Sequence, residues 1–307
     1  MQPVYWKYII TLLGLFNVNL YTAMVKVIIN ADDLGLNPTV NAKIYEALSK
    51  GYVTSSTILA NSEYWDEVRL IISKCQWASF GVHLNLTEGK ALTENLLFKS
   101  LGIVDDYNCF LGNIRHNNLS DPKLQEAIYD EWDAQLNKII CQENVNVTHV
   151  DGHHHIHTDF ALQNILVSLL NKYGITRVRN RYTYPVGGGK RLIRNVTNKI
   201  ASRNLYRMLK PSSLKIVNRP ATILNYHVET SLWHKHIGNN RVLTDYFDSY
   251  EHFLMQISMG YKPKDGEIAE LMCHPGHENY KNEFLMILLR KLQQHILDLI
   301  LISYNDL

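Results

Sequence analysis

Short apolar runs alternate with longer stretches of helically spaced apolar residues from Val25 almost to the end of the chain. Runs of five to seven residues have the length of buried strands, whereas apolar residues recurring every third or fourth position predict helices. We expect strands at 25–29, 53–59, 80–86, 145–150, 175–179 and 268–273. We expect helices at 38–50, 122–140, 159–172 and 278–299, the first two introduced by Asn37-Pro38 and Asp121-Pro122. Strands separated by helices are typical of βα units, so the pattern predicts an α/β fold with a parallel sheet.

Length and composition place the chain among ordinary globular proteins. Its 307 residues are 46% hydrophobic and 20% charged, which excludes a disordered, collagen-like or coiled-coil chain. A formal net charge of +2 is too small to predict a polyanionic partner, so we expect no nucleic acid ligand. The four cysteines are far apart and form no CxxC pair, which favours reduced thiols over a zinc knuckle or a thioredoxin-like site.

Two segments of the chain, one at the N-terminus and one inside the predicted domain, differ from the βα pattern. Residues 1–23 contain an apolar run at 8–16, which is shorter than the roughly 18 residues of a spanning helix. They are therefore an N-terminal extension or a signal peptide, and the working domain is expected at 24–307. We favour a cytoplasmic location, with secretion as the alternative if residues 1–23 are a signal, and leave a homo-oligomer open. Twelve Lys or Arg and no acidic residue occur in 177–219, which indicates a basic insertion near 186–240.

Two adjacent carboxylates follow the first predicted strand, in Asn30-Ala31-Asp32-Asp33-Leu34-Gly35. Neighbouring carboxylates repel each other, and partial desolvation at a strand end increases this cost. A bound cation would remove the conflict, and the carboxyl ends of parallel strands are where ligands bind. The alternative is an Asx turn in which Asp32 and Asp33 face water.

Histidine is frequent in this chain, with 14 copies, and several lie at predicted strand ends. His83 lies inside an apolar run, where a lone histidine is more often a hydrogen-bonded core residue than a ligand. The segment 149–157 holds five histidines in nine positions, and in an extended chain His153, His155 and His157 would share one face. Imidazoles in a cleft need partners for both ring nitrogens, which a metal and a carboxylate or carbonyl provide. A histidine tract on the surface with no ligand is the alternative.

A further histidine, His274, follows the predicted strand at 268–273, and Pro275-Gly276 would fix its direction by a turn. In a (β/α) barrel the carboxyl ends of the strands converge on one face, where such folds hold their active sites. A metal held by Asp33, His83 and His153 would keep open positions for water and substrate, which is a catalytic arrangement. Carboxylate and imidazole donors without cysteine suit a divalent ion such as zinc, manganese, cobalt or magnesium.

These segments together resemble the YdjC-like carbohydrate deacetylases, relatives of chitooligosaccharide deacetylase. The resemblance extends from about Met24 to Leu307 and rests on NADDLG at 30–35, GVHLNLTEGKAL at 81–92, THVDGHHHIH at 148–157, AELMCHPG at 269–276 and ISYNDL at 302–307. It implies a (β/α) barrel-like fold, as in the glycoside hydrolase/deacetylase superfamily. It also implies a metal-dependent hydrolysis that removes acetyl groups from N-acetylated carbohydrates of the chitooligosaccharide type.

The resemblance assigns roles to individual residues as well. The three ligands named above keep that role, with Mg²⁺ as the first choice of metal. Asp32 is similar to the general base and His274 to the general acid, while Arg179 is similar to an arginine that steadies the catalytic carboxylate in related polysaccharide deacetylases. His155 and His157 are expected to support the ligands or to contact the acetylated oligosaccharide.

Two other functions remain open from the sequence. A metal-dependent phosphoesterase would also use aspartate and histidine ligands on a barrel, and the basic residues at 177–219 would then contact phosphates. A sugar-binding protein without catalysis would keep the same fold and lose turnover. We predict that acetate release from N-acetylated chitooligosaccharides separates these functions.

Overall fold

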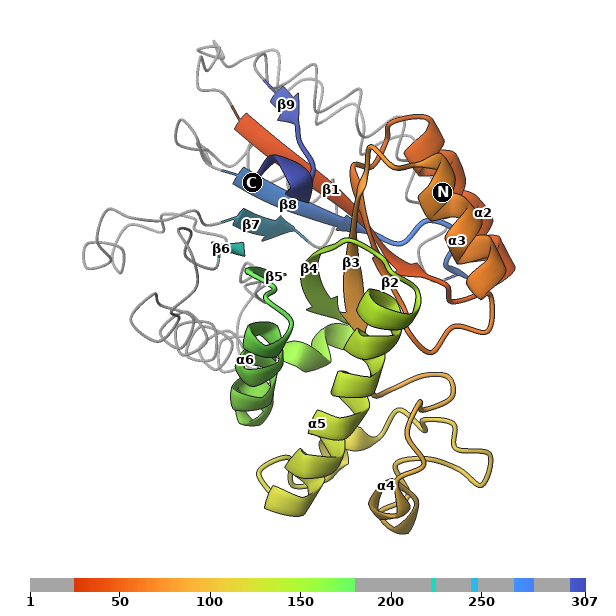
Figure 1. Cartoon of the computed structure of the whole chain (residues 1–307), viewed down its shortest axis with the longest axis vertical. Coiled ribbons are helices and arrows are strands. Elements are labelled where there is room, and N and C mark those ends of the chain that lie inside the picture. Colours follow the sequence, from red (N-terminus) through yellow and green to blue (C-terminus); the bar gives the residue numbers. More distant parts are fainter. Residues whose placement is uncertain (1–24, 180–221, 225–243, 248–267, 279–298) are drawn as a thin grey trace, which may run out of the picture.

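The computed structural model describes residues 25–179, 222–224, 244–247, 268–278 and 299–307 (Figure 1). Its strands are β1 (Val25–Leu34), β2 (Ser55–Ile58), β3 (Ser79–Leu84), β4 (Val147–Gly152), β5 (Arg177–Arg179), β6 (Thr222–Leu224), β7 (Thr244–Phe247), β8 (Ile268–Cys273) and β9 (Leu299–Leu301). Its α-helices are α2 (Pro38–Ser49), α3 (Trp65–Lys74), α4 (Leu96–Ser100), α5 (Pro122–Asn137) and α6 (Gln163–Lys172). Short helical turns are η1 (Ile114–His116), η2 (Lys138–Gln142), η3 (His153–Thr158), η4 (Phe160–Leu162) and η6 (Tyr304–Asp306).

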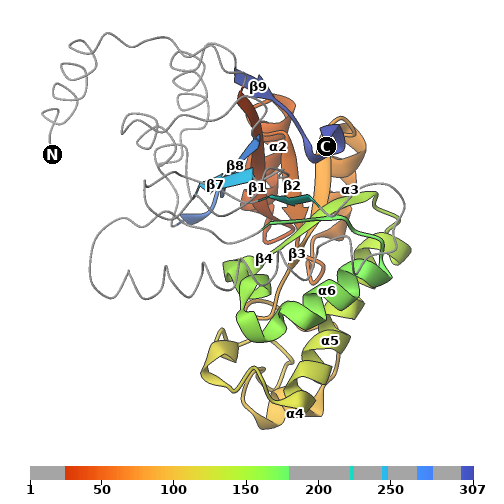
Figure 2. The ribbon, with the colours of Figure 1, turned by 90° about the vertical axis from the view of Figure 1, so that its left-hand side faces the viewer.

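One parallel sheet contains all these strands. Its hydrogen-bonded order is β6-β5-β4-β3-β2-β1-β8-β7, and β9 also pairs with β1. The strands at the two ends of this order, β6 and β7, approach each other, so the sheet curls into a half-barrel. Figure 1 shows α2 and α3 beside β1 and β2, and Figure 2 shows α5 and α6 next to each other, with α4 beyond them. The expected α/β, barrel-like fold is confirmed.

Local signals explain where the helices begin and end. The side chain of Asn37 accepts a hydrogen bond from the Val40 N–H, and Asp121 caps α5 in the same way. The prediction of one helix over 122–140 is corrected at its end, because the α-helical part, α5, ends at Asn137 and the π turn η2 follows it directly. The helix expected at 159–172 begins with the 3-10 turn η4 before α6. Residues 1–23, the basic insertion near 186–240 and the helix expected at 278–299 lie outside the described residues, apart from a few positions.

Alternation along the strands separates an apolar face from a polar one. On β1, Val27, Ile29 and Ala31 belong to the main hydrophobic core under the helices. The intervening Asn30 and Asp32 are buried on the opposite face, inside the curled sheet. The neighbouring strands repeat this period of two, and the buried polar residues of the inner face are Thr57, His83, His149, Asp151, Arg179 and Glu270. The sheet therefore gathers its buried charged side chains in one interior.

In the part of the chain that the structure describes, no helix combines the length and the apolar character needed to cross a membrane.

Candidate metal centre

The adjacent carboxylates of Asp32 and Asp33 both enter the interior of the half-barrel. Consecutive residues of a regular strand point to opposite faces, but the pairing of β1 with β2 shifts register between Ala31 and Leu34. Asp33 has a φ of 71°, a left-handed conformation that aspartate tolerates better than most residues. Each carboxylate is only 2% exposed, so the water-facing Asx turn considered for this pair is wrong.

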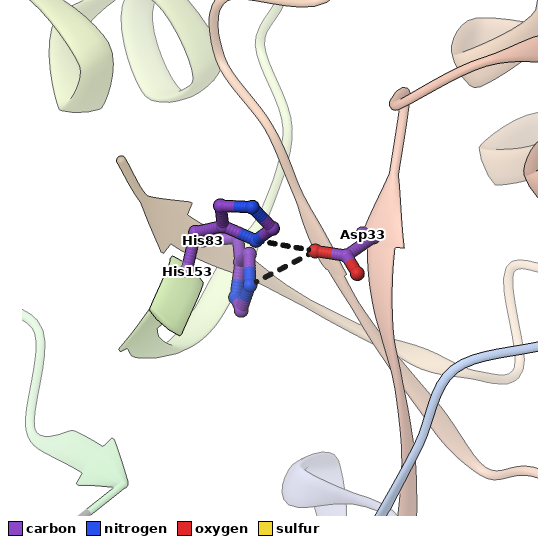
Figure 3. A group of neighbouring side chains, drawn as sticks. All are labelled: Asp33, His83 and His153. Carbon is purple, nitrogen blue, oxygen red and sulfur yellow. Dashed lines mark hydrogen bonds and ion pairs between the residues drawn. The ribbon is translucent and has the colours of Figure 1, made fainter. Parts of the chain in front are cut away.

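Three side chains converge on one point beside β1, β3 and β4. Oδ1 of Asp33 lies 2.8 Å from Nδ1 of His153 and 3.2 Å from Nε2 of His83. Figure 3 shows both imidazole rings turned toward this single oxygen. Ligand atoms that surround a cation at about 2.1 Å are separated by about 3 Å, so the spacing fits a metal site. The structure thus brings together all three residues expected to hold a metal.

Each of the two imidazoles also has a carboxylate on its far side. Nδ1 of His83 lies 2.6 Å from Oδ1 of the fully buried Asp151. Nε2 of His153 lies 3.0 Å from Oε2 of Glu88, whose side chain is half exposed. Metal-binding histidines typically use their second nitrogen in this way, which fixes the ring and its tautomer. The two rings are therefore held with one nitrogen free to face Asp33.

The charges in this cluster shift the pKa values of its members. Burial lowers the pKa of His83, but the carboxylates of Asp151 and Asp33 outweigh it and raise the value to about 10. Burial also lowers the pKa of His153, but the Asp33 carboxylate outweighs it and raises the value to about 9. Burial raises the pKa of Asp33, yet the two imidazoles hold it well below its usual range. A negative oxygen is thus paired with two imidazolium rings, and a divalent cation would take over this positive charge.

Asp32 has a separate partner. Both of its oxygens accept hydrogen bonds of 2.7 Å from Nη1 and Nη2 of Arg179, and Asn30 donates a third bond to Oδ1. Burial raises the pKa of Asp32, and the Arg179 guanidinium outweighs it and lowers the pKa below its usual value. The two-point contact agrees with the role expected of Arg179 as a support for this carboxylate.

His274 follows β8, which is the neighbour of β1 in the sheet. Ala31 pairs with Cys273, so His274 comes next to Asp32 in register, and its charge contributes to the lowered pKa of Asp32. The N–H of His277 donates to the His274 carbonyl and closes the expected turn. His274 is partly exposed, as a group that meets a substrate must be.

The histidine run is not extended as the sequence predicts. Gly152 ends β4, and His153–Thr158 form a 3-10 turn in which His154 and His155 have φ values of 51° and 56°. The expectation that His153, His155 and His157 share one face is therefore wrong. His157 is buried and its Nε2 lies 2.8 Å from the Arg179 carbonyl oxygen, so it holds β5 against the turn.

The sequence interpretation missed two functional candidates in this interior. Asp151 contacts both His83 and Arg179, and Glu270 contacts Arg179 from β8. The signals were present, because Asp151 lies within the histidine-rich segment and Glu270 is a charge inside an apolar strand. A charged residue on the inner face of such a strand must have a buried partner.

The chain is similar to known proteins. Residues 26–298 match the family model described as YdjC-like protein. A carbohydrate deacetylase from Halalkalibacterium halodurans is 32% identical over 165 residues, which are 53% of this chain and 67% of that protein. A carbohydrate deacetylase from Enterococcus faecalis is 34% identical over 153 residues, which are 48% of this chain and 56% of that protein. These alignments thus span about half of this chain and little more than half to two thirds of the relatives.

A solved structure has the same fold. A crystal structure of an Enterococcus faecalis protein, whose description refers to cellobiose-phosphate cleavage, superimposes with a TM-score of 0.62 at 24% identity. The superposition covers 92% of this chain and 99% of that one. The likeness supports the half-barrel fold, and the family model covers most of the chain. The chain belongs to the YdjC-like protein family.

Proposed function

We propose that this chain is a metal-dependent carbohydrate deacetylase that hydrolyses the acetyl amide of N-acetylated saccharides. One observation carries the proposal: Asp33, His83 and His153 form a candidate metal site directly beside a second carboxylate, Asp32, whose two oxygens are both held by the Arg179 guanidinium. The family match and the relatives named carbohydrate deacetylase support an enzyme with this activity.

The donors in the cluster fit a divalent metal. One carboxylate oxygen and two imidazole nitrogens lie within 4.8 Å of one another, and the two rings are already oriented by Asp151 and Glu88. Two imidazoles suit zinc, cobalt or manganese, whereas the family resemblance favours magnesium. When bound, the cation supplies a water of lowered pKa and polarises the acetyl carbonyl.

The protein side chains manage the protons of the reaction. Asp32 accepts the proton of the attacking water, and its carboxylate can do so because Arg179 keeps it ionised and oriented. The new C–O bond forms as this proton leaves the water. His274 then donates a proton to the amide nitrogen, so that the C–N bond breaks and the products are acetate and an amine. Adjacent aspartates would thereby have different tasks, with Asp33 as the residue that would hold the metal and Asp32 as the proton acceptor.

A single comparison tests the proposal. The purified chain is stripped of metal and assayed for acetate release from a panel of N-acetylated chitooligosaccharides, with magnesium, zinc, manganese or cobalt restored one at a time. Acetate release that depends on one of these ions is the expected result. Phosphate release from nitrophenyl phosphate without acetate release would instead establish a phosphoesterase. Stoichiometric metal without turnover of any acetylated sugar would indicate a binding protein.

A further inference from the structure

Asp151 connects two parts of the site that otherwise have separate contacts. It is fully buried on β4, and its two carboxylate oxygens face different partners. Oδ1 lies 2.6 Å from Nδ1 of His83, and Oδ2 lies 2.8 Å from Nη1 of Arg179. The hydroxyl of Thr57 donates to Oδ2 at 3.1 Å and so fixes the carboxylate plane between them. One side chain therefore contacts both a metal ligand and the support of the general base.

The contact with His83 determines which nitrogen faces the metal. With Nδ1 held by Asp151, the opposite nitrogen Nε2 points to Asp33, at 3.2 Å from its Oδ1. A carboxylate behind a metal-binding imidazole also fixes the tautomer, because its partner nitrogen must carry the hydrogen.

The contact with Arg179 acts on the general base. Nη1 of Arg179 is shared between Oδ2 of Asp151 and Oδ2 of Asp32, at 2.8 and 2.7 Å. The guanidinium is planar and rigid, so a partner that moves one of its nitrogens also reorients the contact with the other carboxylate. Asp151 therefore contacts Asp32 indirectly, through the rigid guanidinium of Arg179 that both carboxylates share.

Glu270 provides a comparison within the same cluster. It meets Arg179 from the opposite side, with Oε1 at 2.9 Å from Nε and 2.8 Å from Nη2. Among the described residues it contacts no member of the metal cluster. Glu270 and Asp151 therefore share the guanidinium, and they differ in the contact with His83.

We propose that Asp151 is a positioning residue that couples metal binding by His83 to the orientation of Asp32 through Arg179. This inference rests on the proposed function for its turnover part. Asp151 does not touch the reacting atoms. It acts by holding His83, a candidate metal ligand, and Arg179, which orients Asp32.

The experiment compares Asp151→Asn with Glu270→Gln in the full-length chain. Calorimetric titration of the metal-free protein with Mn²⁺ and with Mg²⁺ gives the metal Kd in the absence of substrate. Acetate release at saturating metal gives kcat and KM separately. We expect D151N to weaken metal binding by about 10- to 100-fold and to lower kcat at saturating metal, with KM little changed. We expect E270Q to lower kcat and to bind metal as the wild type does.

Two outcomes overturn the coupling. Wild-type metal affinity in D151N would remove its role on His83, and wild-type kcat of D151N at saturating metal would remove its role on Asp32. If D151N does not fold, Asp151→Glu replaces it, because this change keeps the charge but displaces the oxygens that contact His83 and Arg179. D151E is then expected to weaken metal binding and lower kcat together, and a change in neither would overturn the proposal. A wild type that binds metal and releases no acetate would refute the proposed function, while the Kd comparison would still decide the role of Asp151 on His83.

Discussion

Replacing Arg179 by lysine tests whether the shape of the guanidinium, beyond its charge, holds the interior together. The side chain is fully buried and meets three carboxylates, those of Asp32, Asp151 and Glu270. Lysine keeps one positive charge but offers three donors from one nitrogen in place of a planar fork. The change therefore removes contacts without leaving the three carboxylates wholly unpaired.

The magnitude follows from the contacts. Arg179 makes five contacts shorter than 3.0 Å to carboxylate oxygens, and an ammonium can keep at most three. Two lost bonds to charged groups, at about 1.5–3 kcal/mol each, set an upper range of about 3–6 kcal/mol. Relaxation of the site reduces this, so we expect a loss of about 3 kcal/mol in the free energy of unfolding.

Turnover should respond to the same substitution. Asp32 would keep at most one of its two contacts with the residue at position 179, and the loss of one such bond corresponds to about a 10- to 150-fold lower kcat. Urea unfolding followed by tryptophan fluorescence gives the stability, and acetate release gives kcat.

Arg179→Met is the control for charge, since it leaves three buried carboxylates without the guanidinium. The order of stability should be wild type, then R179K, then R179M. An R179K protein that loses less than about 1 kcal/mol and keeps wild-type kcat would refute the argument from shape. An R179M protein at least as stable as R179K would refute the argument from charge.

Four further substitutions have definite expected results. His83→Ala should abolish stoichiometric metal binding, whereas Asp32→Asn should keep the metal and lower acetate release by about 10²- to 10⁴-fold; equal metal contents measured by plasma mass spectrometry would contradict these separate roles. Gly81→Ala would place a Cβ 2.6 Å from Cε1 of His149, so urea unfolding should show a loss of about 1–3 kcal/mol, and an unchanged midpoint would mean that the ring is free to move. Asp121→Ala should cost about 1 kcal/mol and speed amide exchange in the first turn of α5, and unchanged exchange there would show that the cap is dispensable.

Much of the fold follows from local signals in the sequence. The strand predicted at 268–273 coincides with β8, and the caps at Asn37 and Asp121 mark the first residues of α2 and α5. These features depend on neighbours within a few positions, which a single sequence contains. The convergence of Asp33, His83 and His153 follows from the same reasoning, because all parallel strands bring their carboxyl ends to one edge.

The histidine run shows where local reasoning fails. An alternating face requires an extended backbone, but Gly152 ends the strand and the chain turns immediately. A Cβ on Gly152 would lie 2.7 Å from Nδ1 of His157, so the close approach of this ring requires glycine. A period of two in the sequence cannot detect such a turn, since the same run of glycine and histidines is compatible with an extended strand and with a turn.

The interior charge cluster could not be assembled from local patterns. Asp32 and Arg179 are 147 positions apart, and Arg179 and Glu270 are 91 positions apart. Alternation predicts that each faces inward, yet it does not say which carboxylate meets which nitrogen. The family resemblance predicted the contact between Arg179 and Asp32. The contacts of Arg179 with Asp151 and Glu270 become visible only in the curled sheet.

The pairing of β1 with both β2 and β8 has a consequence for how the protein matures on the ribosome. The three candidate metal ligands all lie between Asp33 and His153, in the segment from β1 to the turn after β4, which leaves the ribosome before β5 and β8. The guanidinium that supports Asp32 arrives later on β5, and its partner Glu270 arrives on β8 after most of the chain has been made. Because strands far apart in the sequence pair slowly, we expect the nascent chain to bind a cation before Arg179 and Glu270 complete the support of Asp32 that turnover needs.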